Sequence, residues 1–584
     1  RPLDSLLNEA LSLNPSVAAR HSQATGILRL FGQTFGDLTR GSLPEISDEV
    51  DGLVVYNTGS EVAAGQTASK PIVACTPEDP GAVREYALEV AALKLALERA
   101  READRVAFSE LKERYAVATH ALADTVRNVW SSKASWTLVG GLELSGIAGL
   151  SSVLSEAADT AYFKTPPLPN EMIARRELTS QGAKARRMLI DAMLLSSDQE
   201  AFGIGGYGAD RAMYEAVFRF TGIHRVSKGA WKVGRPTDVH WRAAWDEVVE
   251  ALRSATESRL PLTHLYALLE APPYGLKQGV IPVLLCAVLV SHAEETALYE
   301  HGSLVLHIDD AVAERLAKNP SHFTVKNPAV SSPVRQHVVD ALCRDLKIQS
   351  PSGQPTFLEA ATAVFRLLKQ MPPYAHQTRL GLSPETVRIR QAFRMAAEPD
   401  ALFFESLPQI IIGRTITPRA RISDDDITTY TSGLATALRE IKASYSRLLE
   451  TVQSQLREAL GARSDSLAEL HVESIGLAKQ LDGRVLEPRL RAFTGALGRG
   501  QDSPLAWLEN VAMVVAEGHS PRVWTDEIAQ RFSLQIEELG GSFRRTMALL
   551  FERIAESESG FDVRRITVTM PDGSERSAIV SVTE

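Results

Sequence analysis

The sequence contains few of the residues that mark secreted, metal-binding or membrane proteins. Only three of its 584 residues are cysteines, Cys75, Cys286 and Cys343. They are far apart within apolar stretches, so neither a disulfide framework nor a paired-cysteine metal site fits them, and we expect buried free thiols. The longest apolar run, Val280–Val290, contains a proline and is too short to cross a bilayer. With no visible signal peptide, the composition predicts a cytoplasmic protein that does not enter the membrane.

Positive charge is not in excess either. The chain has 63 Lys and Arg against 72 Asp and Glu, a formal net charge of -9. Such a surface does not attract nucleic acid as a whole, so any nucleic-acid binding needs a local basic patch. The hydrophobic fraction of 44% and the charged fraction of 23% are typical of a folded protein. The length predicts several domains.

The common catalytic motifs are missing as well. The chain has no GxxxxGK[ST] phosphate loop, no HExxH, no GxSxG and no GxGxxG after a strand. The glycine-rich GIGGYGAD at 203–210 lacks the lysine and Ser/Thr of a phosphate loop, which favours a turn between helices. His301 and His307 lie on an expected hairpin, where a surface position is favoured over a metal site. We therefore expect no cofactor in this chain.

The sequence does contain many helical patterns and a few strands. We expect a mainly α, multi-domain protein of the α+β class. Apolar runs at 51–59 and 70–77 predict buried strands, and residues 3–31 are typical of helix. The expected segments are an α/β segment, possibly the end of an ATPase domain (1–79), a long helix or a helical hairpin turning near 103–104 (80–135), a helical domain with a basic helix (136–270), a winged-helix-like module (271–350), a helical linker domain (351–420), a helical bundle (421–560) and a C-terminal β-hairpin (561–584).

The winged-helix-like module is predicted from four consecutive patterns. GVIPVLLCAVLVSH indicates a buried helix, ETALYEHGSLVLHI a hairpin around His301–Gly302, DDAVAERLAKNP an amphipathic helix with an Asp cap, and HFTVKN a closing strand. Winged helices bind DNA or mediate protein contacts. Because the basic residues here are sparse among many acids, a structural or protein-contact role is favoured. Those basic residues are Lys277, Arg315, Lys318 and Lys326.

One stretch gathers positive charge in this acidic chain. NEMIARRELTSQGAKARRMLIDAML, at 170–194, contains Arg175, Arg176, Lys184, Arg186 and Arg187. A helix with a Thr179 or Ser180 cap is expected to carry the last three. The stretch predicts phosphate contacts with double-stranded DNA that do not depend on base sequence. The alternative is a helix face that is solvated or paired with acids of the same chain.

A second basic neighbourhood is mixed with aromatic residues. HRVSKGAWKVGRPTDVHWRAAW, at 224–245, contains Lys228, Lys232 and Arg235 together with three tryptophans. Basic and aromatic side chains together are typical of nucleic-acid surfaces. Trp241 and Trp245 are one helical turn apart, however, which favours core packing for these two.

A run of acids supplies a candidate for enzymatic chemistry. Asp424, Asp425 and Asp426 are consecutive carboxylates that could hold Mg²⁺ for nuclease chemistry. No second acidic strand accompanies them, and acids at the start of a helix are the favoured explanation. A metal-dependent nuclease is therefore kept as an alternative function.

Several phrases, in this order, resemble one family. They are similar to the region downstream of the nucleotide-binding part of very large P-loop ATPase proteins of bacterial anti-phage defence islands, of the BREX ATPase type, over most of residues 75–560. The phrases are LPNEMIARRELTSQGAKARRMLIDAML, GIGGYGADRAMYEAVFRFTGIHR, APPYGLKQGVIPVLLCAVLVSHAEETALYEHGSLV, ERLAKNPSHFTV, MPPYAHQTRLGLSPETVRIRQAFRMAAEPDALFFESLP and VWTDEIAQRFSLQIEELGGSFRR.

The resemblance implies an ATPase core that acts on DNA and has other defence-system proteins as partners. The phosphate loop of that core is missing here, so no ATP-binding residue carries over. ATP and Mg²⁺ are expected only if an ATPase domain lies elsewhere in the protein. This chain, which starts at Arg1 rather than Met, would then be the C-terminal part of that protein. A degenerate relative that never binds nucleotide is the alternative.

The expected function is a non-catalytic scaffold and DNA-contacting region of a phage-defence ATPase. Its expected partners are double-stranded DNA and other defence-system proteins. Besides the nuclease, the alternative is a pure protein-assembly module in which the long arm at 80–130 makes a homo-oligomer.

Overall fold

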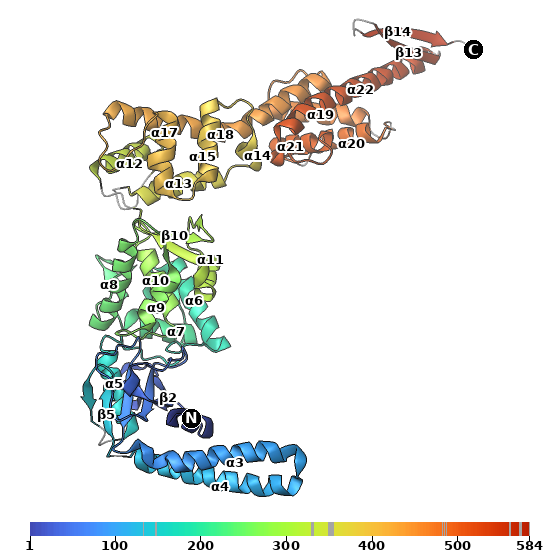
Figure 1. The fold of residues 1–584 in the computed structure, drawn as a ribbon. Helices are drawn as coiled ribbons and strands as arrows, with labels where there is room; N and C mark the ends of the chain where they lie inside the picture. The colour runs from blue at the N-terminus through green and yellow to red at the C-terminus, as the bar shows by residue number, and fades with distance from the viewer. Residues whose placement is uncertain are drawn as a thin grey trace. The chain divides into compact units, whose positions relative to one another are not determined.

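The structure is a computed structural model, mainly helical with one mixed sheet, and belongs to the α+β class as expected (Figure 1). It divides into two compact units, Arg1–Pro328 and Ala329–Glu584, which are described separately. The boundary falls inside the expected 271–350 module. The residues that the structure describes are 1–131, 133–145, 149–328, 332–348, 355–481, 483, 485, 487–500, 502–559, 562–570 and 575–582.

The sheet of the first unit has the strand order β1-β2-β3-β4-β5-β6, in which β2, β3 and β4 are parallel and the other neighbours antiparallel. The strands are β1 (Ser16–Val17), β2 (Leu30–Gly36), β3 (Gly52–Asn57), β4 (Ile72–Thr76), β5 (Ser135–Leu138) and β6 (Leu142–Leu144). The two strands expected from apolar runs are β3 and β4.

The helical expectation for residues 3–31 is wrong in part. Only α1 (Leu3–Ala10) and α2 (Ala19–Thr25) are helical, and the sheet takes β1 and the start of β2 from the same stretch. Gly26, at φ 72°, ends α2 in a left-handed conformation that suits glycine. The alternation that buries Phe31 and Phe35 is a strand pattern that a helical interpretation overlooks.

Both faces of the sheet are covered. On one face, Phe31, Val54 and Val73 pack against α5 (Leu150–Ala161). Further along the strands, Phe35 and Cys75 pack with residues of α1 and of the helical arm described below. The other face is covered by Leu38 and neighbouring residues that follow β2. All three cysteines are buried free thiols, as expected.

The chain leaves the sheet after β4 as a two-helix arm, visible at the bottom of Figure 1. After η2 (Pro80–Val83), α3 (Arg84–Ala103) and α4 (Arg105–Val129) run antiparallel. The turn lies at Asp104, where the sequence predicts it. The Asp104 carboxylate accepts hydrogen bonds from the backbone N–H groups of Val106 and Ala107, at 2.9 and 3.1 Å, and so caps α4.

The rest of the first unit is a helical body with a large apolar core. Its helices are α6 (Ser180–Ser196), η3 (Glu200–Gly203), α7 (Ala209–Tyr214), η4 (Glu215–Arg219), α8 (Val239–Ser254), α9 (Leu262–Glu270), α10 (Ile281–Ser291), α11 (Asp310–Lys318) and η5 (Pro320–His322). Its strands are β7 (His224–Ser227), β8 (Ala230–Val233), β9 (Leu260–Pro261), β10 (Ala297–Glu300), β11 (Ser303–Leu304) and β12 (Phe323–Lys326).

Helix α10 lies at the centre of this body, and every residue from Ile281 to Leu289 is buried. A small sheet of order β11-β10-β12-β9 accompanies it, with the β10–β11 turn at His301–Gly302. Asp309 caps α11 by accepting a hydrogen bond from the N–H of Val312 at 2.8 Å. These elements match the four patterns seen in the sequence.

The second unit is built on two long helices, α18 and α22. Ser423 caps α18, and its hydroxyl and the Asp426 side chain form a reciprocal capping box. The helices are α12 (Pro333–Asp345), α13 (Phe357–Lys369), α14 (Pro373–Gln377), α15 (Pro384–Met395), α16 (Pro399–Ala401), η6 (Leu402–Ser406), α17 (Leu407–Ile411), α18 (Asp424–Leu460), α19 (Leu467–Gln480), α20 (Pro488–Leu497), α21 (Pro504–Val515), η7 (Pro521–Val523) and α22 (Asp526–Ser559). Strands β13 (Asp562–Thr569) and β14 (Glu575–Val582) pair antiparallel, and residues 571–574 between them lie outside the described part of the chain.

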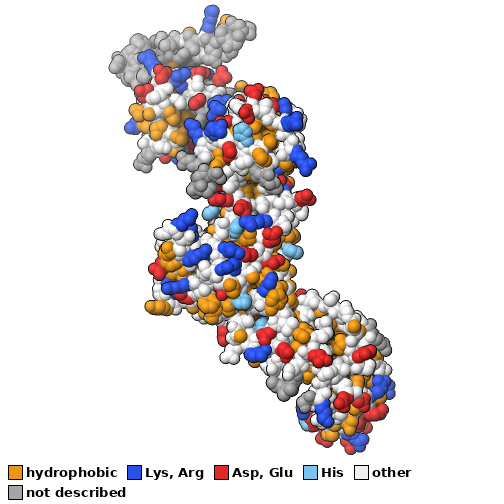
Figure 2. Space-filling model, turned by 90° about the vertical axis from the view of Figure 1, so that its left-hand side faces the viewer, with side chains coloured by type: hydrophobic (Ala, Val, Ile, Leu, Met, Phe, Trp, Pro, Cys, Tyr) orange, Lys and Arg blue, Asp and Glu red, His pale blue; other side chains and the backbone are white. Residues whose placement is uncertain are grey.

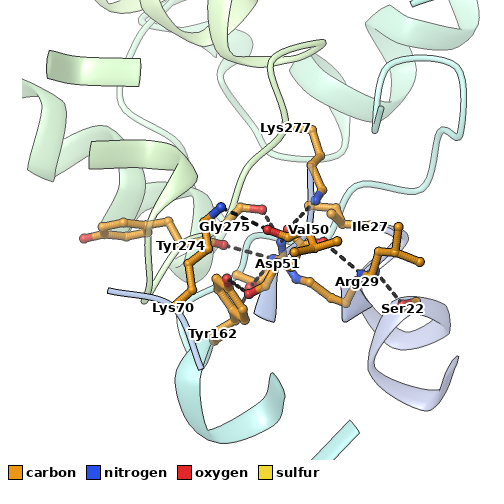
Figure 3. Close-up of polar contacts among 12 residues, drawn as sticks. Ser22, Ile27, Arg29, Val50, Asp51, Lys70, Tyr162, Tyr274, Gly275 and Lys277 are labelled. Atoms are coloured by element: carbon orange, nitrogen blue, oxygen red, sulfur yellow. Dashed lines mark hydrogen bonds and ion pairs between the residues drawn. The ribbon is translucent and has the colours of Figure 1, made fainter. Parts of the chain in front are cut away.

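A buried charge cluster joins the sheet to the helical body (Figure 3). Asp51, just before β3, forms an ion pair with Lys277 and lies 3.5 Å from the Arg29 guanidinium. Arg29 donates to the carbonyl oxygen of Gly275 at 2.6 Å and stacks over the Tyr162 ring at 4.1 Å. Since Arg29 is fully buried and Asp51 only 7% exposed, these contacts fix the loop before α10 to the sheet.

Candidate phosphate-binding surface

Helix α6 positions the basic residues predicted from the sequence, but it is shorter than the basic stretch. Thr179 caps it, as expected, by accepting a hydrogen bond from the N–H of Gly182 at 3.2 Å. The preceding residues form turns instead of a first helix. There the Asn170 side chain accepts from the N–H groups of Met172 and Ile173, at 3.1 and 3.3 Å, which replaces helical hydrogen bonds.

These turns are held against the loop that precedes α10. The N–H of Gly279 donates to the carbonyl oxygen of Arg175 at 2.9 Å. A Cβ at Gly279 would lie 2.3 Å from the carbonyl oxygen of Ile173, so the close approach requires glycine. Because Lys277 of the same loop is fixed on Asp51, the buried cluster indirectly positions the basic residues.

Two neighbouring pockets lie beside α6. One, of 250 Å³, lies between α6 and α11 and is lined by Lys184, Arg186, Arg187, Lys318 and acidic and apolar neighbours. The other, of 440 Å³, is lined by Arg176, Arg186 and Lys318 together with residues of α9. The structure therefore brings four of the five predicted cations of the stretch, and Lys318, to adjoining hollows.

Two of these five cations are already paired with acids. Arg187 contacts the Glu314 carboxylate at 3.0 Å and that of Asp191 at 3.7 Å. Lys318 contacts the other oxygen of Glu314 at 2.7 Å. Glu314 thus bridges the two cations, and the expectation of a helix face paired within the chain holds for Arg187.

The other cations are not neutralised. Arg176 and Lys184 form no ion pair with any residue that the structure describes. Arg186 donates to the carbonyl oxygens of Gln278 and Gly279, at 3.3 and 3.2 Å, which carry no net charge. Burial lowers the pKa of Arg186, while Tyr266 and Cys286 act in the opposite direction. These three side chains therefore leave positive charge available to a ligand.

Arg175 lies to the side of the pockets. Its Nε donates to the carbonyl oxygen of Glu171 at 3.1 Å, and the two charged groups are 3.9 Å apart. Both side chains are exposed, with Arg175 at 55%, so this ion pair is screened by water and weak.

The second predicted basic group is separate from the first. Lys228 and Lys232 are exposed on the β7–β8 hairpin, whose turn has positive φ at Lys228 and Gly229. His224, at the start of β7, hydrogen-bonds to the carbonyl oxygen of Ser197 at 2.9 Å, just beyond the C-terminal end of α6. At 1.5 Å per residue, that end is about 20 Å from Lys184.

This second group is also less available than its sequence suggests. Arg235 is paired with Asp246 through two contacts, one of them at 2.7 Å. Trp241 and Trp245 are buried in the core, as expected. Trp231 packs on the His224 ring, with centroids 4.9 Å apart. The tryptophans that suggested base stacking are therefore engaged within the protein.

The three consecutive acids form the first turn of α18. Asp426 takes part in the capping box and contacts Arg414 at 3.2 Å, and Asp424 lies 3.7 Å from His337. Within the described part of the chain, no group of three or more His, Cys, Asp or Glu side chains could hold a metal ion. In the same part of the chain, no helix is both long and apolar enough to span a membrane.

The sequence did not identify the residues that complete this surface. Lys318, Glu314 and Tyr266 come from α11 and α9, at least seventy residues after the end of α6, and reach it only through the fold. The i,i+4 pair of Glu314 and Lys318 was a signal for an exposed helix face, but nothing in the sequence linked it to α6. Figure 2 shows Lys and Arg interspersed with Asp and Glu over the visible face, in keeping with the acidic composition.

Comparison of the chain with models of protein families, with curated proteins and with solved structures gives no match.

Proposed function

We propose that the chain is a non-catalytic scaffold and DNA-contacting region of a bacterial phage-defence ATPase system. The observation that carries the DNA contact is the group of three cations, Arg176, Lys184 and Arg186, that have no acidic partner among the described residues. In a chain of net charge -9, unneutralised cations beside a hollow favour an anionic ligand. The defence system and its partner proteins rest on the resemblance of the quoted phrases.

The mechanism is electrostatic. Backbone phosphates approach Arg176, Lys184 and Arg186, with Arg175 and Arg187 at the edge of the contact. Lys228, Lys232 and Arg235 would meet a more distant part of the same duplex. Such contacts release counterions, so the affinity falls steeply with salt and depends little on base sequence. Under this proposal, ATP and Mg²⁺ take part only if an ATPase domain lies elsewhere in the protein.

The scaffold part rests on interpreting the region around α10 as a winged-helix-like module. Strand β9 lies between α8 and α9 in the chain, strands β10 and β12 follow α10, and β12 lies between β10 and β9 in the small antiparallel sheet. In this arrangement α10 has the place of a recognition helix, which reads DNA by lying in the major groove. Its burial over Ile281–Leu289 leaves no face for a groove. We therefore assign protein contacts to the module, and we assign the DNA contact to the basic residues beside α6.

Fluorescence anisotropy of labelled duplex DNA tests the contact, at low and at physiological salt. We expect salt-sensitive binding by the wild type. The double variant Arg176→Ala/Lys184→Ala should reduce the slope of log affinity against log salt by about two, since each lost phosphate contact removes roughly one.

The matched control is Arg187→Ala. It removes one arginine from the same helix, but one that Glu314 already holds at 3.0 Å, so its effect should be smaller than that of Lys184→Ala alone. Absence of binding by the wild type at low salt would rule out the DNA contact. Equal losses for Lys184→Ala and Arg187→Ala would refute the role given to unpaired charge.

A second candidate function is assembly through the arm, and α3 carries the observation that favours it. Besides its seam with α4, α3 exposes Leu88 at 39% and Leu95 at 52%, with Ala92 also exposed between them. The spacing of four and three residues puts all three on one stripe. A helix that is apolar on two faces is normally covered on both.

The occupant that fits this stripe is α3 of a second copy. Glu85 and Arg99 lie seven residues before and after Ala92, so they end the stripe with opposite charges. Antiparallel pairing about Ala92 brings Glu85 of each copy opposite Arg99 of the other. The patch is thus self-complementary, as a two-fold interface requires.

Sedimentation of the full chain tests this candidate. We expect a dimer that dissociates in Leu88→Glu/Leu95→Glu, whereas Val106→Glu/Val117→Glu, at 76% and 70% exposed sites of α4, leaves it intact. Because all three natural cysteines are buried, Ala92→Cys should cross-link to itself under oxidation. A monomeric wild type, or equal effects of the two double variants, would exclude assembly through α3.

A further inference from the structure

Helices α13, α14 and α15 follow one another in the second unit, with a glycine-containing turn before the last (Figure 1). The turn covers residues 378–383, and Gly381 takes a left-handed conformation at φ 68°. Arg447 of α18 donates a hydrogen bond to the carbonyl oxygen of Gly381 at 2.7 Å, and Ser383 caps α15 by accepting one from the N–H of Thr386 at 3.1 Å. Two helices joined by a tight turn with a glycine are typical of the helix-turn-helix motif, although this turn is longer than the usual three to four residues or so.

Buried contacts hold these three helices together. Arg390, on the inner face of α15 and only 6% exposed, donates hydrogen bonds to the carbonyl oxygens of Ala375, at 3.0 Å, and Thr378. These two oxygens lie at the end of α14 and just beyond it. Phe393, about one turn after Arg390, packs against Phe365 of α13 with ring centroids 5.7 Å apart. The inner face of α15 is thus fixed on both preceding helices, which sets the direction of its outer face.

The outer face of α15 is exposed over most of its length. Arg388, Gln391 and Arg394 recur at every third residue and are all exposed, and Met395 is 77% exposed. Residues three apart are neighbours on a helix surface, so these side chains form one stripe. Helix α10, which is buried over Ile281–Leu289, has no such stripe. The side chains of α15 can therefore reach a partner where those of α10 cannot.

The segment around α15 is strongly basic. Residues 360–397 contain six Lys and Arg against a single acid, Glu385. Arg390 is used inside the fold, and the other five cations are exposed and form no ion pair with any residue that the structure describes. They are Arg366, Lys369, Arg379, Arg388 and Arg394. In an acidic chain, five unneutralised cations on neighbouring elements favour a polyanionic partner.

We propose that α13–α15 form a helix-turn-helix site in which α15 enters the major groove of double-stranded DNA and reads base pairs with Arg388 and Gln391. Both residues lie in the first two turns of α15, the part of a recognition helix that contacts base edges. Arginine donates two hydrogen bonds to a guanine edge, and glutamine exchanges two with an adenine edge. Arg379, Arg394 and the cations of α13 approach the flanking phosphates. This site is separate from the contact beside α6 and does not rest on it.

Dimensions and side-chain types favour duplex DNA over other polyanions. The major groove of B-DNA, about 12 Å wide, admits an α-helix, whereas that of an RNA helix is too narrow for side chains to read. Gln391 stands between two arginines and adds a neutral group with both a donor and an acceptor. An adenine presents the matching acceptor and donor in the major groove. The stripe therefore suits base edges as well as phosphates.

Selection of binding sites from a random duplex library by the full chain tests the base reading. We expect the wild type to enrich one short base sequence. Gln391→Ala changes no charge, so it should lower the affinity for that sequence by roughly fivefold or more and leave the affinity for unselected duplex unchanged. The matched control is Arg394→Ala, which removes a phosphate contact from the same stripe. It should weaken selected and unselected duplexes by the same factor.

The variant Arg176→Ala/Lys184→Ala keeps this test apart from the contact beside α6. It should weaken every duplex and leave the selected base sequence unchanged. A wild type that enriches no sequence, or a preference that survives in Arg388→Ala/Gln391→Ala, would overturn the assignment of α15, whatever the α6 variant does. No enrichment together with salt-sensitive binding of polyglutamate, lost in Arg388→Ala/Arg394→Ala, would overturn it in favour of an acidic protein partner.

Discussion

Two groups of cations in the first unit differ in what surrounds them. Arg29 and Lys277 are buried around the Asp51 carboxylate, and every contact holds chain segments together. Arg176 is half-buried and Lys184 is exposed, both beside hollows and with no acidic partner among the described residues. The sequence alone does not distinguish the two groups, because each consists of a few Lys and Arg residues in an acidic chain.

The difference indicates how to distinguish structural from ligand-binding cations. A buried cation must be paired, because removing charge from water is expensive. An exposed cation needs no partner, so leaving several together in an acidic chain is the unusual arrangement. Arg187, held by Glu314, is intermediate and provides an internal standard.

The largest effect is expected for Asp51→Asn. The substitution leaves two buried cations without their acid and should lower the free energy of unfolding by about 3–5 kcal/mol, the usual cost of breaking a buried ion pair. Urea denaturation of the full chain measures it. Asp48→Asn is the control, because Asp48 is fully exposed and 3.7 Å from Lys70. A loss as small as that of the control would remove the contrast between the two groups.

The contribution of Asp51 should also depend on pH. Burial alone would raise its pKa, but Lys277, Arg29 and the Leu30 N–H outweigh burial and lower the pKa below 3.8. The unfolded chain therefore binds the proton more readily than the folded one. The stabilisation is present above pH 3.8 and is lost as the pH falls through the lower folded value. The difference between wild type and Asp51→Asn should narrow in that acid range.

Gly279→Ala should affect both groups at once. The new Cβ would meet the carbonyl oxygens of Ile173 and Arg175 at 2.3 and 2.6 Å, so the loop has to move. We expect a loss of about 2 kcal/mol of stability, as for other overpacked sites, together with weaker duplex binding because Arg186 loses its carbonyl partners. Thermal unfolding measures the stability, and fluorescence anisotropy measures the affinity for duplex DNA. Unchanged DNA affinity would mean that the loop before α10 does not position the basic residues for DNA binding.

A smaller and opposite effect is expected for Tyr266→Phe. Removing a buried hydroxyl that lacks a partner among the described residues should stabilise the protein by about 1 kcal/mol. The melting temperature of the two proteins measures it. A destabilised variant would mean that the hydroxyl is already satisfied.

The smallest effect sharpens the comparison within α6 itself. Glu314→Gln releases Arg187 and Lys318 from their shared carboxylate. Exposed ion pairs are weak because water screens them, so duplex affinity should rise by no more than about fivefold. A fall in affinity would mean that Glu314 orients these side chains for the phosphate.

Much of the local structure was predictable from the sequence. The turn at Asp104, the Thr179 cap and the burial of Trp241 and Trp245 follow from residues near in sequence. The strand character of β2 was not recognised, because a short strand between two short helices carries little periodic signal.

The candidate site was predictable only in part. The cations of α6 were visible as a run, but their pairing state depends on Glu314, which α11 brings to α6 from far along the chain. The same holds for Tyr266, an ordinary apolar-face tyrosine until the fold places it beside Arg186. Lys277 was counted as one of a few basic residues of the expected module, and only the fold reveals its carboxylate partner.

The arm has a consequence for how the first unit folds. It is an insertion between β4 and β5, which nevertheless pair directly. Its two helices pack against each other as one continuous hairpin, and we expect such a local helical unit to form early in folding. Once the α3–α4 hairpin has formed, it holds the end of β4 and the start of β5 as near to each other as a short turn would. The length of the arm therefore adds little to the entropy cost of pairing β4 with β5, a cost that in any case grows only slowly with the number of residues in a loop.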